Sequence, residues 1–106
     1  MIGLCIAALP ALAAASSQAS TSQPALITGI IVTEGKVFFN LDSARTARPA
    51  CATMSTRWAF NAATAQGQAM LSTLLSFKAM GKPVIVQGTG ACPDWSDTET
   101  VQYLFE

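Results

Sequence analysis

Three residues near the C-terminus have side chains that could do chemistry together: Asp94, Trp95 and Asp97, in the segment CPDWSD. An aromatic ring beside carboxylates is a common arrangement for holding a sugar, because the ring stacks on C–H groups while the acids accept hydroxyl protons. The alternative is a structural role, in which Trp95 covers a disulfide and Asp97 caps a turn through its side chain. We take these three residues as candidate ligand contacts.

Catalytic chemistry has little support in this chain. Histidine is absent, which removes the commonest general base near neutral pH, the commonest metal ligand and the usual partner of a Ser or Cys nucleophile. Asp94, Asp97 and Glu99 could suggest a calcium loop or a carboxylate pair for glycoside cleavage. Their spacing matches no EF-hand, and Pro93 and Trp95 interrupt it. We predict no enzyme activity, no metal and no cofactor, with a small hydrolase as the alternative.

Charge is sparse and balanced, with 6 Lys and Arg against 6 Asp and Glu in 106 residues. Nucleic-acid binding needs a basic face to displace phosphate counterions, and membrane-surface binding needs a polybasic segment. The composition therefore argues against both kinds of partner, single-stranded nucleic acid included. Arg45 and Arg48 lie in the polar loop 42–50, where they could bind a sugar carboxylate or be solvated. Arg57 is expected to be a paired residue on a strand surface.

The N-terminal residues 1–15 fit an export signal. They are apolar and end in alanines, but they fall short of the roughly 20 residues that span a bilayer. Cleavage is expected at small residues, Ala11-x-Ala13 or Ala13-x-Ala15, although no Lys or Arg precedes the apolar run. A buried N-terminal helix is the alternative. The signal predicts an exported protein, periplasmic or secreted, with no stable membrane insertion after cleavage.

Export also determines the state of the cysteines. Cys5 would leave with the signal, so Cys51 and Cys92 would remain. An even count in an oxidising compartment predicts one disulfide between them. Two free buried thiols in a cytosolic protein are the alternative. A cross-link of this span should stabilise the fold by roughly 4 kcal/mol in the chain-entropy model, a large part of the roughly 5–10 kcal/mol expected for so small a domain.

The elements that must position these residues begin after a polar segment. Residues 16–25 lack periodicity and are predicted to be a disordered spacer ahead of a domain at 26–106. Alternating apolar residues predict strands at 26–33, 36–41 and 51–61, the first two joined by a tight turn at Gly35. The expected inner-face residues of the second and third strands are Val37, Phe39, Leu41, Met54, Thr56, Trp58 and Phe60.

A helix is predicted from Thr64, as N-cap, to about Met80, with Gly81 ending it. Its apolar stripe comprises Gly67, Met70, Leu71, Leu74 and Phe77. Two further strands are expected around Val84–Val86 and from Val101, with Val101, Tyr103 and Phe105 on one face. The order is therefore β-β-β-α-β-β. In a short chain this order is typical of the five-stranded OB-fold barrel, and an open antiparallel sheet covered by one helix is the alternative.

The chain resembles the binding subunits of subtilase-cytotoxin-type bacterial toxins, and small exported bacterial proteins that share their domain. The resemblance spans residues 26–106. It rests on three motifs: Arg57-Trp58-x-Phe60; Gly81-Lys82-Pro83-Val84; and Gly88-x-Gly90-x-Cys92 with Trp95.

This resemblance implies an OB-fold that forms a pentameric ring and binds sialylated glycans without catalysis. In the family, a hydroxyl residue before a glycine on the first strand contacts the sugar, and Thr28 before Gly29 occupies that place here. The helix region is several residues longer than in the family, and no acidic residue precedes the first strand. We therefore expect a non-catalytic exported binding module for a glycan or another exported protein. A periplasmic structural or protein-interaction domain is the alternative.

Overall fold

The computed structural model describes residues 19–45 and 47–106, so the predicted signal peptide and Cys5 lie outside the described residues. The elements are β1 (Ile27–Thr33), β2 (Lys36–Leu41), β3 (Arg57–Asn61), α1 (Ala65–Met80), β4 (Ile85–Gly88) and β5 (Val101–Phe105). This order confirms the predicted mainly β domain with one helix between the third and fourth strands.

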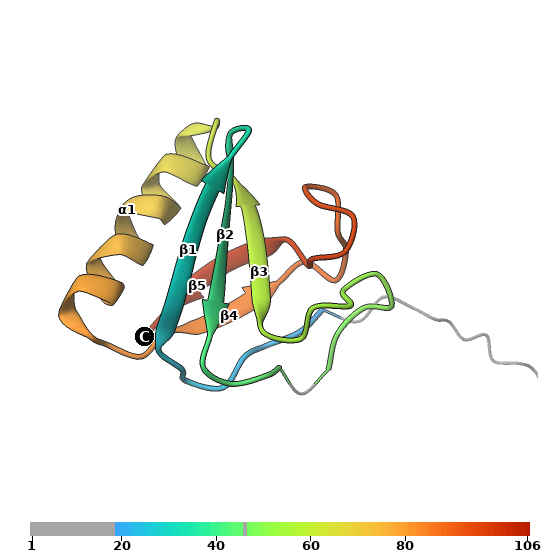
Figure 1. The fold of residues 1–106 in the computed structure, drawn as a ribbon, viewed down its shortest axis with the longest axis horizontal. Helices are drawn as coiled ribbons and strands as arrows, with labels where there is room; N and C mark the ends of the chain where they lie inside the picture. The colour runs from blue at the N-terminus through green and yellow to red at the C-terminus, as the bar shows by residue number, and fades with distance from the viewer. Residues whose placement is uncertain (1–18, 46) are drawn as a thin grey trace, which may run out of the picture.

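The strands form two antiparallel sheets, one ordered β1-β2-β3 and the other made of β4 and β5. In Figure 1, β4 and β5 lie behind the three-stranded sheet, and α1 runs along one side. Among residues 19–45 and 47–106, the strands of the two sheets are joined by a single parallel bridge, between Ala59 of β3 and Thr100, just before β5. The strand ladders of the described residues therefore leave the predicted closed barrel unestablished.

Local signals fix the turns and the helix ends where the sequence predicts them. Glu34 and Gly35 both have positive φ, 53° and 76°, in the turn that joins β1 to β2. The Thr64 hydroxyl accepts a hydrogen bond from the Gly67 N–H at 2.9 Å, so it caps the start of α1. Gly81 ends the helix in the left-handed region, at φ 65°.

The core lies between the two sheets and α1. The predicted inner faces of β2 and β3 are confirmed, because Val37, Phe39 and Trp58 are at most 1% exposed. From α1, Leu74 and Phe77 enter the same cluster, with Met70 packed against it. The expected apolar stripe of the helix is thus the face that covers the core.

Gly67 lets the first turn of α1 approach the end of β3. A Cβ at this position would collide with the main-chain oxygen of Asn61 and press on Ala62. We expect Gly67→Ala to destabilise the fold by about 1–3 kcal/mol, since a backbone contact cannot yield as a flexible side chain can. Urea denaturation measures the loss. Gly29→Ala is the control, because its Cβ would meet nothing within 4 Å, and equal losses from the two variants would contradict this packing.

The predicted spacer is wrong for its described part, residues 19–25, which run along β4. The Ser22 N–H donates to the Val86 carbonyl at 2.8 Å. The Ala25 N–H and carbonyl both pair with Val84, at 3.0 and 2.8 Å. The main chain of this segment therefore makes the hydrogen bonds of the outer edge of β4. Such pairing depends on main-chain groups, so a Ser- and Thr-rich composition does not predict it.

Two strands differ from their predicted form. The third begins at Arg57 rather than Cys51, and Met54 is 40% exposed instead of facing the core. In β5, Tyr103 pairs with Gln87 but Val101 pairs with Gly88, so Gln102 is an extra residue in the ladder. The bulge reverses the facing of the later residues of β5: Val101 is buried, whereas Tyr103 and Phe105 are 51% and 42% exposed.

Candidate functional site

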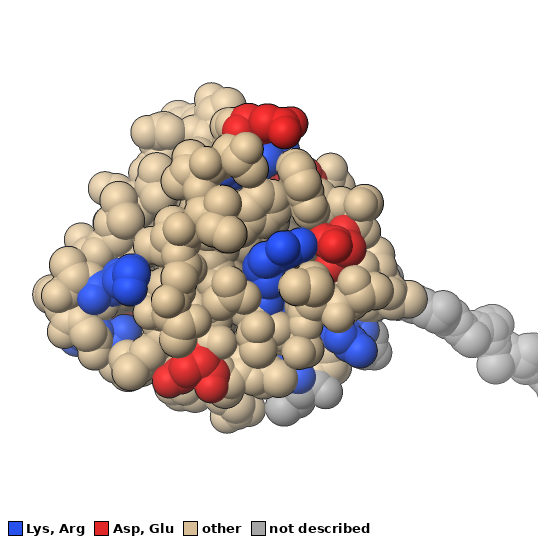
Figure 2. Space-filling model, in the orientation of Figure 1, with Lys and Arg blue, Asp and Glu red and all other residues tan. Residues whose placement is uncertain are grey.

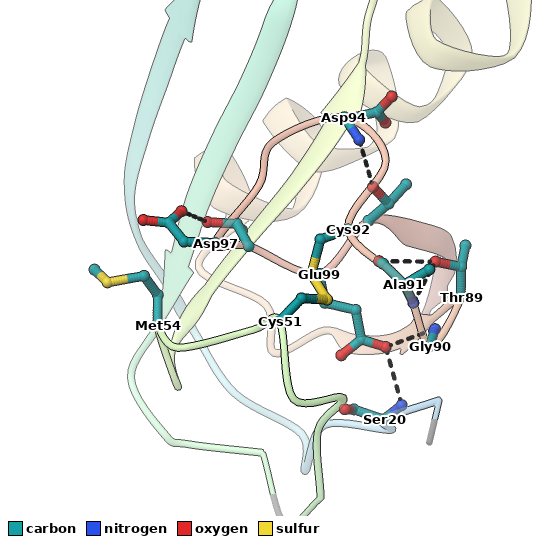
Figure 3. The surroundings of a disulfide bond; sticks show 12 residues. Ser20, Cys51, Met54, Thr89, Gly90, Ala91, Cys92, Asp94, Asp97 and Glu99 are labelled. Carbon is teal, nitrogen blue, oxygen red and sulfur yellow. Dashed lines mark hydrogen bonds between the residues drawn. A yellow bond between two sulfur atoms is a disulfide. The ribbon is translucent and has the colours of Figure 1, made fainter. Parts of the chain in front are cut away.

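The loop between β4 and β5, residues 89–100, carries every predicted ligand contact except Thr28. Cys92 in this loop forms a disulfide with Cys51, with 6.2 Å between the two Cα atoms, which confirms the predicted pairing. The Thr53 N–H, near Cys51, donates to the Asp97 carbonyl at 3.1 Å. The loop is therefore held against the segment that precedes β3 both covalently (Figure 3) and by its main chain.

Trp95 packs on the outer face of the three-stranded sheet. Its ring meets the Phe38 ring edge-on, with centroids 4.8 Å apart. Phe38 alternates with the core residues Val37 and Phe39, so it faces away from the core, yet it is only 4% exposed. Trp95 itself is half-buried. Contact with Phe38 therefore accounts for the position of Trp95 without a ligand.

Asp97 is engaged by Arg57 of β3. The Arg57 Nη2 atom lies 2.7 Å from Asp97 Oδ1, and Arg57 Nε donates to the Thr98 hydroxyl at 3.0 Å. The Thr98 hydroxyl in turn donates to Asp97 at 2.9 Å. Arg57 is thus a paired strand residue, as predicted. The Asp97 side chain is 46% exposed, and ion pairs this open contribute little stability.

Thr28 lies at a bulge of β1, whereas the other predicted contacts belong to the loop 89–100. Ile27 pairs with Leu41 and Gly29 pairs with Asn40, so Thr28 is the extra residue between them and is exposed. Among the described residues its hydroxyl makes no side-chain hydrogen bond to residues 89–100. The structure does not assemble Thr28, Trp95 and Asp97 into one hydrogen-bonded cluster.

Asp94 points away from Asp97 and toward α1 (Figure 3). It lines a hollow of about 150 Å³ where β3 and β5 separate and α1 begins. The other lining residues come from the end of β3, the first turns of α1 and the start of β5: Phe60, Asn61, Thr64, Gln66, Gly67, Met70, Thr100 and Val101. The lining therefore combines amides, hydroxyls and one carboxylate with apolar side chains.

A second hollow of about 220 Å³ continues along β5. It lies between Ala69, Met70 and Thr73 of α1 and residues 102–104 of β5. Because Gln66 and Met70 line both hollows, we treat them as one surface, the α1–β5 groove. Asp94 is the one charged residue among its lining residues.

A buried ion pair lies on the other side of the disulfide loop. Glu99 has no exposed surface, and its Oε2 atom accepts from the N–H groups of Ser20 at 3.1 Å and Gly90 at 2.9 Å. The Glu99 Oε1 atom lies 3.9 Å from Nε of Arg45, and both side chains are fully buried. Figure 3 shows the Glu99 carboxylate joining Ser20 to Gly90 beside the disulfide.

Arg45 is therefore neither solvated nor free to bind a sugar carboxylate, which corrects both expectations for this residue. Its guanidinium lies 3.8 Å from the ring centroid of Trp58 and donates to the carbonyls of Met54, at 2.8 Å, and Arg57. Burial lowers the pKa of Arg45 to about 10, against the opposing attraction of Glu99, so the side chain stays charged at neutral pH. Arg48 is exposed, as expected.

Neither Arg45 nor Glu99 carries a sequence signal for burial, because both lie in polar loop segments. Among residues 19–45 and 47–106 there is no cluster of three or more residues that could hold a metal ion. Within the same residues, no helix is long and apolar enough to cross a membrane.

No family model, curated protein or solved structure matches this chain.

The geometry alone therefore indicates what the site can do. Of the four predicted contacts, Trp95 and Asp97 engage other side chains, Thr28 stands apart, and Asp94 enters the α1–β5 groove. The groove offers hydrogen-bonding groups next to an apolar wall. Such a lining suits binding through hydrogen bonds and apolar contact.

Proposed function

We propose that this chain is a non-catalytic, exported binding module whose ligand occupies the α1–β5 groove. The observation that carries the proposal is the groove itself: two adjoining hollows, of about 150 and 220 Å³, that share Gln66 and Met70. Export is supported by the Cys51–Cys92 disulfide, since disulfides persist mainly in oxidising compartments.

The charge of the groove limits its ligands to neutral or basic ones. Asp94 takes part in none of the ion pairs that join described residues. Its carboxylate would repel the carboxylate of a sialylated glycan, which is the ligand that the family resemblance implies. Figure 2 also shows Lys and Arg scattered over the visible face rather than gathered into a basic patch. Neutral glycans and uncharged or basic polypeptides are the ligand classes that fit.

The finer fold proposed is an OB-like barrel. The single bridge between Ala59 and Thr100 joins the two sheets on one side. On the other side, residues 19–25 bridge to β4 at Gln87 and Val84 and lead directly into β1. These contacts follow the strand order β1-β2-β3-β5-β4, and this order supports the barrel. A pentameric ring is compatible with this arrangement and would give a weak site avidity.

Filling the groove tests the proposed function. The full chain, produced in an oxidising compartment, would be screened against a glycan array and a random ten-residue peptide library. We expect Thr73→Arg, which places a long cationic side chain across the groove, to weaken binding of the selected glycan or peptide at least about ten-fold, or about 1.4 kcal/mol. Titration calorimetry measures the affinity.

Ser76→Arg is the matched control, because Ser76 is exposed on the same helix and does not line the groove. It adds the same charge and should leave the affinity within about two-fold. The proposed site is wrong if Thr73→Arg and Ser76→Arg bind equally well, or if neither the array nor the library yields a binder.

A further inference from the structure

We infer that the partner in the α1–β5 groove is an extended polypeptide that adds to β5 as a further strand, an inference that rests on the proposed function. The carrying observation is that β5 has one paired edge and one free edge, and that the groove runs along the free one. Strand addition to an exposed sheet edge is a general mode of peptide recognition, in which the main chain supplies much of the affinity.

The free edge follows from the hydrogen bonding of β5. Its ladder is formed with β4 alone, from Ile85–Phe105 to Gly88–Val101. Within the described chain, no other main-chain or side-chain hydrogen bond reaches residues 101–105. The three-stranded sheet packs against the start of β5 through the core, but among the described residues its one strand bridge to this region is Ala59–Thr100. Beyond that bridge the main-chain groups on one edge of β5 are available to a partner.

Because α1 lies alongside the free edge of β5, this edge forms one side of a groove. Along β5 the walls of the groove are helix side chains on one side and residues 102–104 on the other. At the Asp94 end, Phe60 and Asn61 of β3 join the lining. The five residues of β5 span about 17 Å at the usual strand rise of about 3.4 Å. A partner segment of four to six residues, on the order of that length, would match the edge.

The side chains of the groove define the sequence of the partner. Met70 and Leu104, both partly buried against the core, form an apolar wall for one side chain of the added strand. Asp94 lines the end of the groove beside Val101. Charge complementarity with its carboxylate favours a Lys or Arg at the end of the partner that reaches this point. The partner is therefore an extended segment with apolar residues and a basic terminal residue.

A polypeptide fits the free edge better than a sugar does. A strand edge presents N–H and C=O groups in a fixed repeat along the chain, and a second strand reproduces that repeat. A sugar can hydrogen-bond to the amide and hydroxyl side chains of the groove, but it cannot match the row of main-chain groups. Binding through β5 must therefore depend on the main chain of the partner, and this dependence separates the two ligand classes.

An N-methyl scan of the partner tests the inference without changing the protein. Ten-residue peptides selected from the random library on the full oxidised chain would be resynthesised with one main-chain N-methyl group at each position in turn. We expect methylation to lower the affinity at least about ten-fold at alternate positions and to have little effect between them, since every second N–H of a strand faces its neighbour. Thr73→Arg should abolish binding of the unmethylated peptides.

The Asp94 contribution is measured in the same assay. Asp94→Asn should weaken peptides that carry Lys or Arg by up to about five-fold, as expected for a partly exposed ion pair. Versions with norleucine in place of the basic residue should bind the variant and the wild type equally.

The outcomes separate this inference from the proposed function. Peptides that compete for the groove but tolerate every N-methyl group would overturn strand addition and leave the binding module standing. If only neutral glycans were selected, and Thr73→Arg abolished their binding, strand addition would likewise be overturned and the binding module would stand. Peptides that bind the Thr73→Arg variant with the same affinity as the wild type would overturn both the inference and the proposed site.

Discussion

Replacing Glu99 by alanine is expected to cost about 3–5 kcal/mol of folding free energy, because it leaves the charged Arg45 buried without its partner. The same change removes the acceptor of two main-chain N–H groups, those of Ser20 and Gly90. A loss of this size approaches the whole stability of many small domains. The measurement is urea denaturation of the full chain with the disulfide intact.

A double-mutant cycle shows whether the ion pair is the cause. Arg45→Met, Glu99→Gln and the double variant would be compared with the wild type. Because the two side chains are in contact range, at 3.9 Å, we expect the double variant to be more stable than the sum of the single losses implies, by about 0.5–3 kcal/mol. If the losses simply add, or if Glu99→Ala costs under about 1 kcal/mol, the pair has no such role.

Removing the disulfide should have an effect of similar size. Cys51 and Cys92 are 41 residues apart, and a cross-link of that span is worth about 4 kcal/mol in the chain-entropy model. The variant Cys51→Ser/Cys92→Ser, in a Cys5→Ser background that prevents thiol exchange, should lose about this amount. Thermal and urea unfolding measure the loss against Cys5→Ser alone.

The reduced wild type provides the matching control for that variant. If the covalent link itself is responsible, reduction and substitution should lower the urea midpoint to the same extent. A loss under about 1 kcal/mol, or free thiols at both positions in natively produced protein, would contradict the importance of the bridge. The second result would also remove the main support for export.

The sequence predicts those elements that depend on local signals. Thr64 starts α1 and Gly81 ends it, as expected, because a capping hydroxyl and a glycine at positive φ act within one turn of their own position. The alternation of Val37 and Phe39 places them in the core for the same reason. The pairing of Cys51 with Cys92 followed from counting cysteines, which requires no knowledge of the fold.

The features that the sequence does not predict depend on long-range contacts. The bulge at Gln102 reverses the facing of Tyr103 and Phe105, and the alternation of residues alone cannot show it. The burial of Arg45 depends on Glu99, which lies far from it in the sequence, in the loop ahead of β5. The groove has no motif at all, because its walls come from three elements that only the fold brings together.

The side chains of the predicted site lie apart for a related reason. Asp94, Trp95 and Asp97 are close in sequence, but their side chains leave the loop in different directions, toward α1, toward Phe38 and toward Arg57. A loop held at a disulfide and at several main-chain contacts can present neighbouring residues to separate surfaces. Proximity along the chain is therefore a weak guide to a shared site in irregular segments.

The path of residues 19–25 sets a limit on how far proteases can shorten this chain from its amino end. Ser20 contacts Glu99 through its N–H, and its carbonyl accepts from Gly88 at 2.8 Å. Cleavage ahead of Ala19 would leave these contacts in place. Trimming past Ala25 would uncover a second strand edge, that of β4, and deprive the Glu99 carboxylate of one donor. A processed form with the edges of both β4 and β5 unpaired would tend to form strand pairs with other extended chains and to aggregate with copies of itself.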